Sequence, residues 1–186
     1  DYRNDKYVFV MGGGKGSSIN KIGSALFVVN LEDAEHPGAI YGSEKNKGPI
    51  AIADTIRTMT YPNGSDIPNS IPASPVVITP DNISGVNWRG AMVYVNDLEG
   101  KITKVNLTNS RKAINGLEAT DTKMFHQKTI LTLAATIANG RLSYHSMDAA
   151  TGRDTKQFWL FGSTGHYERI NDTKDMTNDN IMYGIK

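Results

Sequence analysis

Apolar segments in this chain are short, and polar connections rich in glycine, asparagine and proline separate them. The clearest block predicts three successive strands, at Val76–Thr79, Ala91–Val95 and Lys101–Leu107. Residues Asn96–Gly100 join the last two, and Asn, Asp and Gly tolerate the positive φ that a tight turn requires. This pattern therefore predicts a β-hairpin.

The middle strand of this block is apolar on both of its faces. Successive side chains of a strand point to opposite sides of the sheet. Met92 and Tyr94 therefore share one face, while Val93 and Val95 share the other. Strands of this kind are typical of stacked sheets, in which neither side meets water.

The remaining apolar segments also have the length of strands. Residues 129–137 are apolar without interruption and predict a buried inner strand, with which residues 142–148 are expected to pair. Residues 50–59 are ambiguous between a strand and one or two helical turns. The other expected strands are Tyr7–Met11, Ala25–Asn30, Ala39–Tyr41, Gln157–Gly162 and Ile181–Ile185.

Two segments far apart in the chain share one pattern. YVFVMGGGKG, from Tyr7, and QFWLFGSTGHY, from Gln157, each lead an aromatic and apolar strand into a glycine-rich corner. Such an echo favours an array of β-propeller-like blades of antiparallel strands, and thus an all-β fold. We expect approximate blades at residues 1–60, 70–125 and 126–186. Because a propeller usually closes with about four to eight blades, about three would be an incomplete fragment of a larger propeller.

Composition narrows the classes of function. The chain has 186 residues, of which 39% are hydrophobic and 21% charged, as in a globular protein. Its net charge of +1 offers no electrostatic footprint for nucleic acid, and the absence of cysteine excludes disulfides, thiolate zinc sites and cysteine catalysis. No apolar run reaches the roughly 18 residues that a membrane-spanning helix needs. Because the chain starts at Asp1, we expect an internal piece of a longer protein.

In this order, the segments resemble the C-terminal propeller of the PilY family, the type IV pilus tip and biogenesis proteins that include PilC-type adhesins. The family's signature blade is similar to SIPASPVVITPD followed by RGAMVYVNDLEGKITKVNLT. The other similar segments are VFVMGGGKG, SALFVVNLEDAEHPGAIYG, TILTLAATI and FWLFGSTGHYERIND with NIMYGIK. The resemblance covers nearly the whole chain.

The resemblance implies a non-enzymatic bacterial protein of the extracellular or outer-membrane surface, associated with pili. Such a protein supports pilus assembly together with minor pilins at the pilus tip, and it contributes to adhesion to a host or surface receptor. Two alternatives stay open: a generic extracellular propeller interaction module, and a quinoprotein-dehydrogenase-like propeller with a bound quinone. Blades of the dehydrogenase kind repeat a tryptophan, whereas this chain has only Trp88 and Trp159, neither at the expected place after a hairpin.

Calcium is the cofactor that the family's propeller implies, through a loop of alternating carboxylates and amides before the central strand. Asp81 takes the first position of that loop. The other positions hold residues without suitable oxygens, so the loop is degenerate: Ile83, Gly85 and Arg89. A second loop places oxygen-bearing side chains at calcium-like spacing: Asn171, Thr173, Asp175 and Asp179. It lacks glycine at the sharp turn, so a solvated loop is the simpler interpretation and calcium the alternative.

Other polar motifs favour structural roles. Gly12–Ser17 follows a strand as a phosphate-binding loop does, but Gly16 separates Lys15 from Ser17, which favours a blade corner. Asp97 and Glu99 are expected to cap backbone amides or face water, rather than to serve acid–base chemistry. The four histidines lack metal-ligand spacing: His36, His126, His145 and His166.

Overall fold

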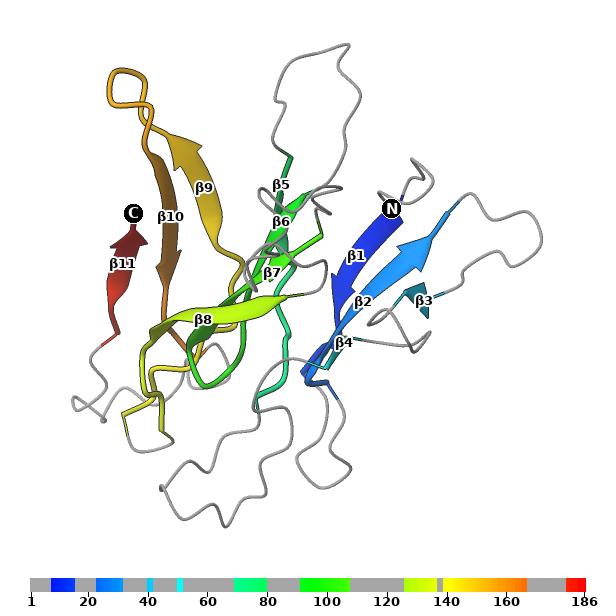
Figure 1. The fold of residues 1–186 in the computed structure, drawn as a ribbon. Coiled ribbons are helices and arrows are strands. Elements are labelled where there is room, and N and C mark those ends of the chain that lie inside the picture. Colours follow the sequence, from blue (N-terminus) through cyan, green and yellow to red (C-terminus); the bar gives the residue numbers. More distant parts are fainter. Residues whose placement is uncertain are drawn as a thin grey trace.

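The computed structural model describes residues 8–15, 23–31, 40–41, 50–51, 69–79, 91–107, 126–136, 139–166 and 180–186. All regular secondary structure within these ranges is β-strand. The named strands pair only in antiparallel ladders, and they form three sheets (Figure 1). The expectation of an all-β fold with antiparallel strands is therefore confirmed.

The three sheets follow one another along the chain. The N-terminal sheet holds β1 (Val8–Gly12), β2 (Ala25–Asn30), β3 (Ile40–Tyr41) and β4 (Ile50–Ala51), with β2 pairing to all three others. The central sheet holds, in order across it, β5 (Val76–Ile78), β6 (Met92–Asn96), β7 (Lys101–Asn106) and β8 (Gln127–Thr132). The C-terminal sheet holds β9 (Asp148–Thr151), β10 (Phe158–Ser163) and β11 (Met182–Ile185), with β10 in the middle.

The predicted hairpin is present in the central sheet. β6 and β7 pair with Met92 opposite Asn106 and Asn96 opposite Ile102. Gly100 closes the turn with a φ of 76°, a left-handed conformation that glycine adopts at little cost. The hairpin predicted from Asn, Asp and Gly is therefore confirmed.

The predicted buried inner strand at residues 129–137 is wrong in its extent, its burial and its partner, since every residue of β8 (Gln127–Thr132) is half-buried or exposed. β8 ends at Thr132 and lies at the edge of the central sheet, where it pairs with β7 instead of residues 142–148. The N–H of Leu133 still bonds to the carbonyl of Gly100 opposite it, and the backbone then changes direction at Ala134, which has a φ of 50°. Of the ambiguous segment 50–59, the structure describes only β4, and the rest lies outside the described residues.

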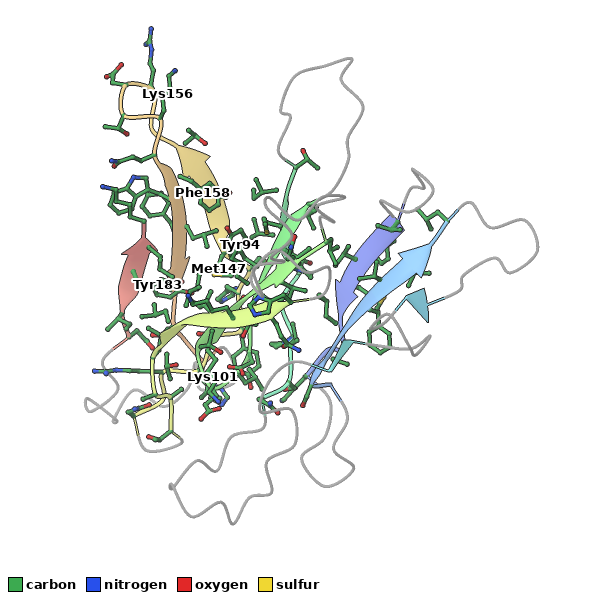
Figure 2. The ribbon with its side chains drawn as sticks, in the orientation of Figure 1. Tyr94, Lys101, Met147, Lys156, Phe158 and Tyr183 are labelled. Carbon is green, nitrogen blue, oxygen red and sulfur yellow. The ribbon has the colours of Figure 1, made fainter. Side chains whose placement is uncertain are left out.

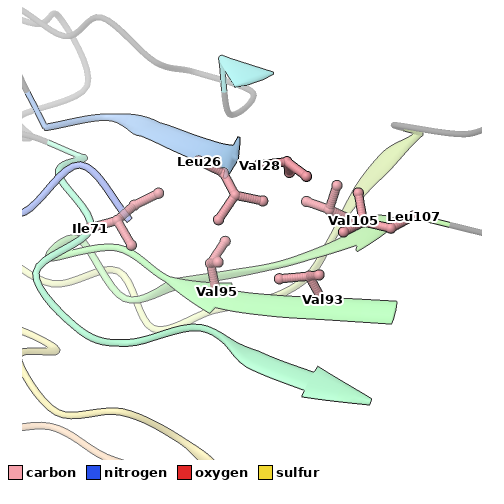
Figure 3. Close-up of a cluster of buried hydrophobic side chains, with 7 residues drawn as sticks. All are labelled: Leu26, Val28, Ile71, Val93, Val95, Val105 and Leu107. Atoms are coloured by element: carbon pink, nitrogen blue, oxygen red, sulfur yellow. The ribbon is translucent and has the colours of Figure 1, made fainter. Parts of the chain in front are cut away.

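A hydrophobic cluster joins the N-terminal sheet to one face of the central sheet (Figure 3). Its buried members are Leu26, Val28, Ile71, Val93, Val95, Val105 and Leu107. Val8 and Val10 of β1 pack against this cluster. Full burial of an aliphatic side chain contributes about 1.5–3 kcal/mol, so the cluster stabilises the contact between these two sheets.

The other face of the central sheet meets the C-terminal sheet. The rings of Tyr94 on β6 and Phe158 on β10 stack with centroids 5.5 Å apart, and Leu160 beside them is buried. Figure 2 shows Tyr94 and Phe158 in the region between β6 and β10. Neighbouring sheets therefore cover both faces of the central sheet, as the two apolar faces of its middle strand predict.

Candidate functional site

The hairpin tip (residues 96–101) between β6 and β7 is buried along its whole length, although most of its residues are polar. The N–H of Leu98 donates to the Ser70 carbonyl over 2.9 Å, and the Leu98 carbonyl accepts from the N–H of Ser143 over 3.4 Å. The hairpin tip therefore lies between the segment that leads into β5 and the segment before β9.

The polar side chains of the hairpin tip bond to backbone and to one another. The Asp97 carboxylate accepts from the N–H of Lys101 over 2.8 Å, and the Asn96 amide donates to the His145 carbonyl over 3.0 Å. The Glu99 Oε2 lies 3.5 Å from the Lys101 Nζ, and both side chains are buried. Asp97 thus caps a backbone amide as predicted, while the alternative that these carboxylates face water is wrong, because neighbouring segments enclose the turn.

Further backbone hydrogen bonds connect this region to the outer sheets. The N–H of Gly14, just after β1, donates to the Ile71 carbonyl over 2.9 Å. On the other side, the N–H of Gly165, just after β10, donates to the Leu142 carbonyl over 2.8 Å. One end of all three sheets is therefore tied together through the segments around the hairpin tip.

The glycine-rich corner after β1 has a structural role where the structure describes it. A Cβ on Gly12 would lie 2.5 Å from the Cγ2 of Ile71, so the backbones approach too closely for a side chain. The Gly14 N–H, which a phosphate-binding loop would direct at its ligand, already bonds to Ile71. Gly16 and Ser17 of the predicted corner lie outside the described residues.

The predicted calcium ligands lie outside the described residues, both at Asp81 and in the loop Asn171, Thr173, Asp175 and Asp179. The described ranges contain no group of three or more histidine, aspartate or glutamate residues that could hold a metal ion. The three described histidines lie apart in different roles. His126 accepts the N–H of Asn106 at its carbonyl, His145 is exposed, and the ring of His166 packs 5.3 Å from that of Tyr144.

An exposed aromatic surface lies on the C-terminal sheet, on the side away from the central sheet. The rings of Trp159 and Phe161 stack 6.1 Å apart across the backbone of Gly184, where an added Cβ would lie 3.2 Å from Phe161. Met182 shares this face and is 90% exposed, while Phe161 is 47% exposed. We call Trp159, Phe161 and Met182 the C-terminal outer face.

A second apolar surface lies on the far side of the N-terminal sheet. Phe9 and Met11 alternate with the inward-facing residues of β1 and are 52% and 42% exposed. Their cross-strand partners on β2 are Val29 and Phe27, which therefore share the same side. We call Phe9, Met11, Phe27 and Val29 the N-terminal outer face.

The period-two alternation of β10 indicates from the sequence alone that neighbouring side chains face opposite sides of the sheet. Phe158 therefore stacks on Tyr94, while Trp159 stacks on Phe161. The exposure of the outer faces was missed. The segments YVFVMGGGKG and QFWLFGSTGHY contain the signal, since their echo places bulky apolar residues at matching outward positions of β1 and β10.

Two half-buried tyrosines have raised pKa values. Burial raises the pKa of Tyr183 to about 12, and it also raises the pKa of Tyr94. Both hydroxyls therefore keep their protons at neutral pH.

Comparisons of the chain with protein-family models, curated proteins and solved structures find no match. In the part of the chain that the structure describes, no helix has the length and apolar character needed to cross a membrane.

Proposed function

We propose that this chain is a segment of a β-propeller-like, non-enzymatic protein of the bacterial cell surface, which supports type IV pilus assembly and adhesion. The observation that carries the proposal is the stacking of sheets in chain order. The N-terminal sheet covers one face of the central sheet and the C-terminal sheet covers the other. Consecutive blades of a propeller follow one another in this way.

The resemblance to the PilY family supports the pilus role. The part that resembles the signature blade corresponds to β5, β6 and β7 of the central sheet. Its NDLEG turn becomes the hairpin tip, which bonds to the segments entering β5 and β9. The residue types of this turn have a physical reason, because its polar groups bond within the turn and to adjoining segments of the chain rather than to water.

A rigid sheet scaffold with apolar outer faces suits a protein that acts by binding. Aromatic side chains that lie flat on a strand lose little conformational entropy when a partner covers them. Minor pilins and a surface receptor are the partners that the proposal names. It assigns no calcium to the loop at Asp81, because Ile83, Gly85 and Arg89 bring no side-chain oxygens to the other ligand positions. Binding, rather than chemistry on a substrate, is therefore the function that we assign.

Fractionation of the source cells tests this proposal. Pili are sheared from wild-type cells and from a matched strain that lacks the major pilin, and tryptic peptides of both sheared fractions are identified. The peptide GAMVYVNDLEGK is expected in the sheared fraction of the piliated strain and absent from that of the pilin-deficient strain. Equal amounts of the peptide in both soluble fractions, with none in sheared pili, would overturn the pilus role and favour a generic interaction module.

A further inference from the structure

The connection between the central and the C-terminal sheets contains an asparagine followed by a glycine, Asn139 and Gly140. This pair of residues is prone to spontaneous deamidation, because glycine has no side chain to hinder attack by its own backbone nitrogen. In that reaction the Gly140 nitrogen bonds to the Asn139 Cγ, and the bond from Cγ to Nδ2 breaks. Ammonia leaves with the proton of the Gly140 N–H, and water then opens the ring to aspartate or isoaspartate.

The side chain of Asn139 is held by backbone groups on both sides of its amide. Its Oδ1 accepts from the N–H of Thr136 over 2.8 Å and from the N–H of Arg141 over 3.1 Å. Its Nδ2 donates to the Ala134 carbonyl over 3.0 Å. Deamidation requires the Cγ to turn toward the Gly140 nitrogen. These three hydrogen bonds therefore hold the reacting carbon in place.

The attacking nitrogen is held as well. The N–H of Gly140 donates to the Thr136 carbonyl over 2.9 Å, and Gly140 is buried. The N–H of Asn139 donates to the Thr136 Oγ1 over 3.0 Å. Because deamidation consumes the proton of the Gly140 N–H, that hydrogen bond has to break first. Thr136 thus restrains both reacting residues.

The same loop is attached to the hairpin tip. The N–H of Ala135 donates to the Glu99 carbonyl over 3.0 Å. Ala134 has a φ of 50°, a left-handed conformation that a residue other than glycine keeps only where its surroundings hold it. The hydrogen bond from Asn139 to the Ala134 carbonyl is part of that support. Release of Asn139 would therefore also loosen the contact between this loop and the hairpin tip.

We propose that Asn139 and Gly140 form a latent self-modification site, which the folded loop holds inactive and which reacts when the loop opens. The reaction makes the opening permanent. Aspartate has no N–H for the Ala134 carbonyl, and isoaspartate adds a carbon to the backbone, which moves Gly140 away from Thr136. A transient opening of the connection between two sheets is converted in this way into a lasting one.

Mass spectrometry of tryptic peptides tests the proposal on the whole chain. The purified chain is incubated at neutral pH for increasing times, with and without urea, and then digested. The peptide TILTLAATIANGR reports the deamidation of Asn139. We expect a native rate at least about tenfold below the rate in urea, because only the opened fraction of the folded chain reacts. A native rate equal to or above the rate in urea would overturn the proposal.

Two variants of Thr136 test whether the hydrogen bonds of the loop control the rate. Thr136→Ala removes the acceptor of the Asn139 N–H, and Thr136→Ser is the matched control that keeps it. Thr136→Ala should raise the native rate at Asn139 roughly threefold to tenfold, because loss of one hydrogen bond enlarges the opened fraction. Thr136→Ser should deaminate no faster than the unchanged chain, and in urea all three rates should be equal.

An unchanged native rate in Thr136→Ala would show that these bonds do not protect Asn139, and the proposal would fail. Circular dichroism establishes that each variant is folded during the incubation. The comparison of native and urea rates uses the unchanged chain, so it decides the matter even where a variant does not fold. All of these rates are measured on purified chain and are independent of pilus association.

Hydrogen exchange tests the second half of the proposal, that the product keeps the loop open. Asn139→Asp imitates the aspartate product, and the amides of Leu133 and Ala135 should exchange roughly tenfold faster in it. Asn180→Asp is the control, since Asn180 accepts from Thr164 through Oδ1, an oxygen that aspartate also has. Exchange in Asn139→Asp as slow as in the control would show that deamidation does not open the loop.

Discussion

The central sheet and the C-terminal sheet are built from strands of the same kind, but water reaches them differently. β6 and β10 are both apolar on two faces. On β6, Val93 and Val95 are buried by the N-terminal sheet, and Tyr94 stacks on Phe158. On β10, the outward Phe161 is 47% exposed. The number of neighbouring sheets, rather than the local pattern, decides the difference.

The turns of the two sheets differ in the same way. The hairpin tip after β6 is buried, with its Asp97 carboxylate bonded to a backbone amide. The turn between β9 and β10 closes with a hydrogen bond from the Gly152 N–H to the Gln157 carbonyl, but its residues 153–156 are exposed. Adjacent segments enclose the first turn only. We therefore expect substitutions to be costly in the central sheet and mild at the C-terminal outer face.

The largest expected effect compares a carboxylate placed inside the stack with one placed outside it. Val93→Asp should destabilise the fold by more than about 4 kcal/mol, because the charge would be buried without a partner. Phe161→Asp should cost roughly 1 kcal/mol, because water reaches that side chain. Urea unfolding followed by circular dichroism measures both. Equal losses at the two positions would remove the distinction between the two sheets.

A smaller effect separates backbone strain from packing at the hairpin tip. Gly100 and Gly14 have similar positive φ values, 76° and 84°. A Cβ on Gly100 would also lie 2.8 Å from the Cβ of Leu133, whereas one on Gly14 would meet nothing within 4 Å. Gly14→Ala should therefore cost about 1–2 kcal/mol for the left-handed backbone alone, and Gly100→Ala about 1–3 kcal/mol more for the crowding.

Denaturant midpoints of the two variants check this difference. The tip is tied to neighbouring segments by Leu98, so the loss in Gly100→Ala should appear in the whole unfolding transition rather than in a local one. If Gly14→Ala lowered the free energy of unfolding as much as Gly100→Ala, close packing around the hairpin tip would not contribute to the loss of stability.

A still smaller effect tests packing inside the C-terminal sheet. A Cβ on Gly162 would overlap the ring and hydroxyl of Tyr183, so Gly162→Ala should cost about 1–2 kcal/mol through displacement of that ring. Gly165→Ala is the matched control, since its Cβ would meet nothing within 4 Å. Thermal unfolding of both variants measures the difference. A loss in the control as large as that in Gly162→Ala would attribute the effect to backbone entropy instead.

Local features of the fold could be predicted from the sequence. The hairpin of β6 and β7 follows from the residues of its turn, and the two-sided burial of β6 follows from its alternation of apolar residues. The partner and the edge position of β8 could not be predicted, because an apolar run indicates a strand but determines neither its neighbours nor its burial. The backbone just beyond the strand is held by hydrogen bonds to Gly100 and Glu99, more than 30 residues away in the chain.

The candidate surface was harder to predict than the strands. Trp159 and Phe161 are residues of the kind that usually lie in a core. Water reaches this side of the C-terminal sheet because none of the three sheets in the described residues packs against it. Asp97 and Glu99 show the converse: their charge favours exposure to water, but neighbouring segments bury both. Exposure is a property of the assembled stack, so a single strand pattern does not determine it.

The smallest expected effect concerns Tyr183, on the inward side of the same sheet whose outward side is exposed. Within the described residues its buried hydroxyl has no hydrogen-bond partner. Tyr183→Phe should therefore change stability at neutral pH by less than about 1 kcal/mol. A larger loss would indicate that the hydroxyl has a structural role.

The pH dependence of Tyr183→Phe is more informative than its stability at pH 7. Burial raises the pKa of Tyr183 from 10.0 to about 12, so the folded chain holds this proton more tightly than the unfolded chain does. The contribution of Tyr183 to the free energy of unfolding is then fully present below about pH 10. It falls as the pH rises toward 12, because the tyrosine ionises in the unfolded state first. Tyr183→Phe should lose less stability between pH 9 and 11.5 than the unchanged chain, in urea unfolding at each pH. Phe161→Tyr is the matched control on the outward side, where water reaches the side chain, so it should leave that slope unchanged. Parallel curves for Tyr183→Phe and the unchanged chain would show that the inward side is hydrated as well, and the two sides of the C-terminal sheet would no longer differ.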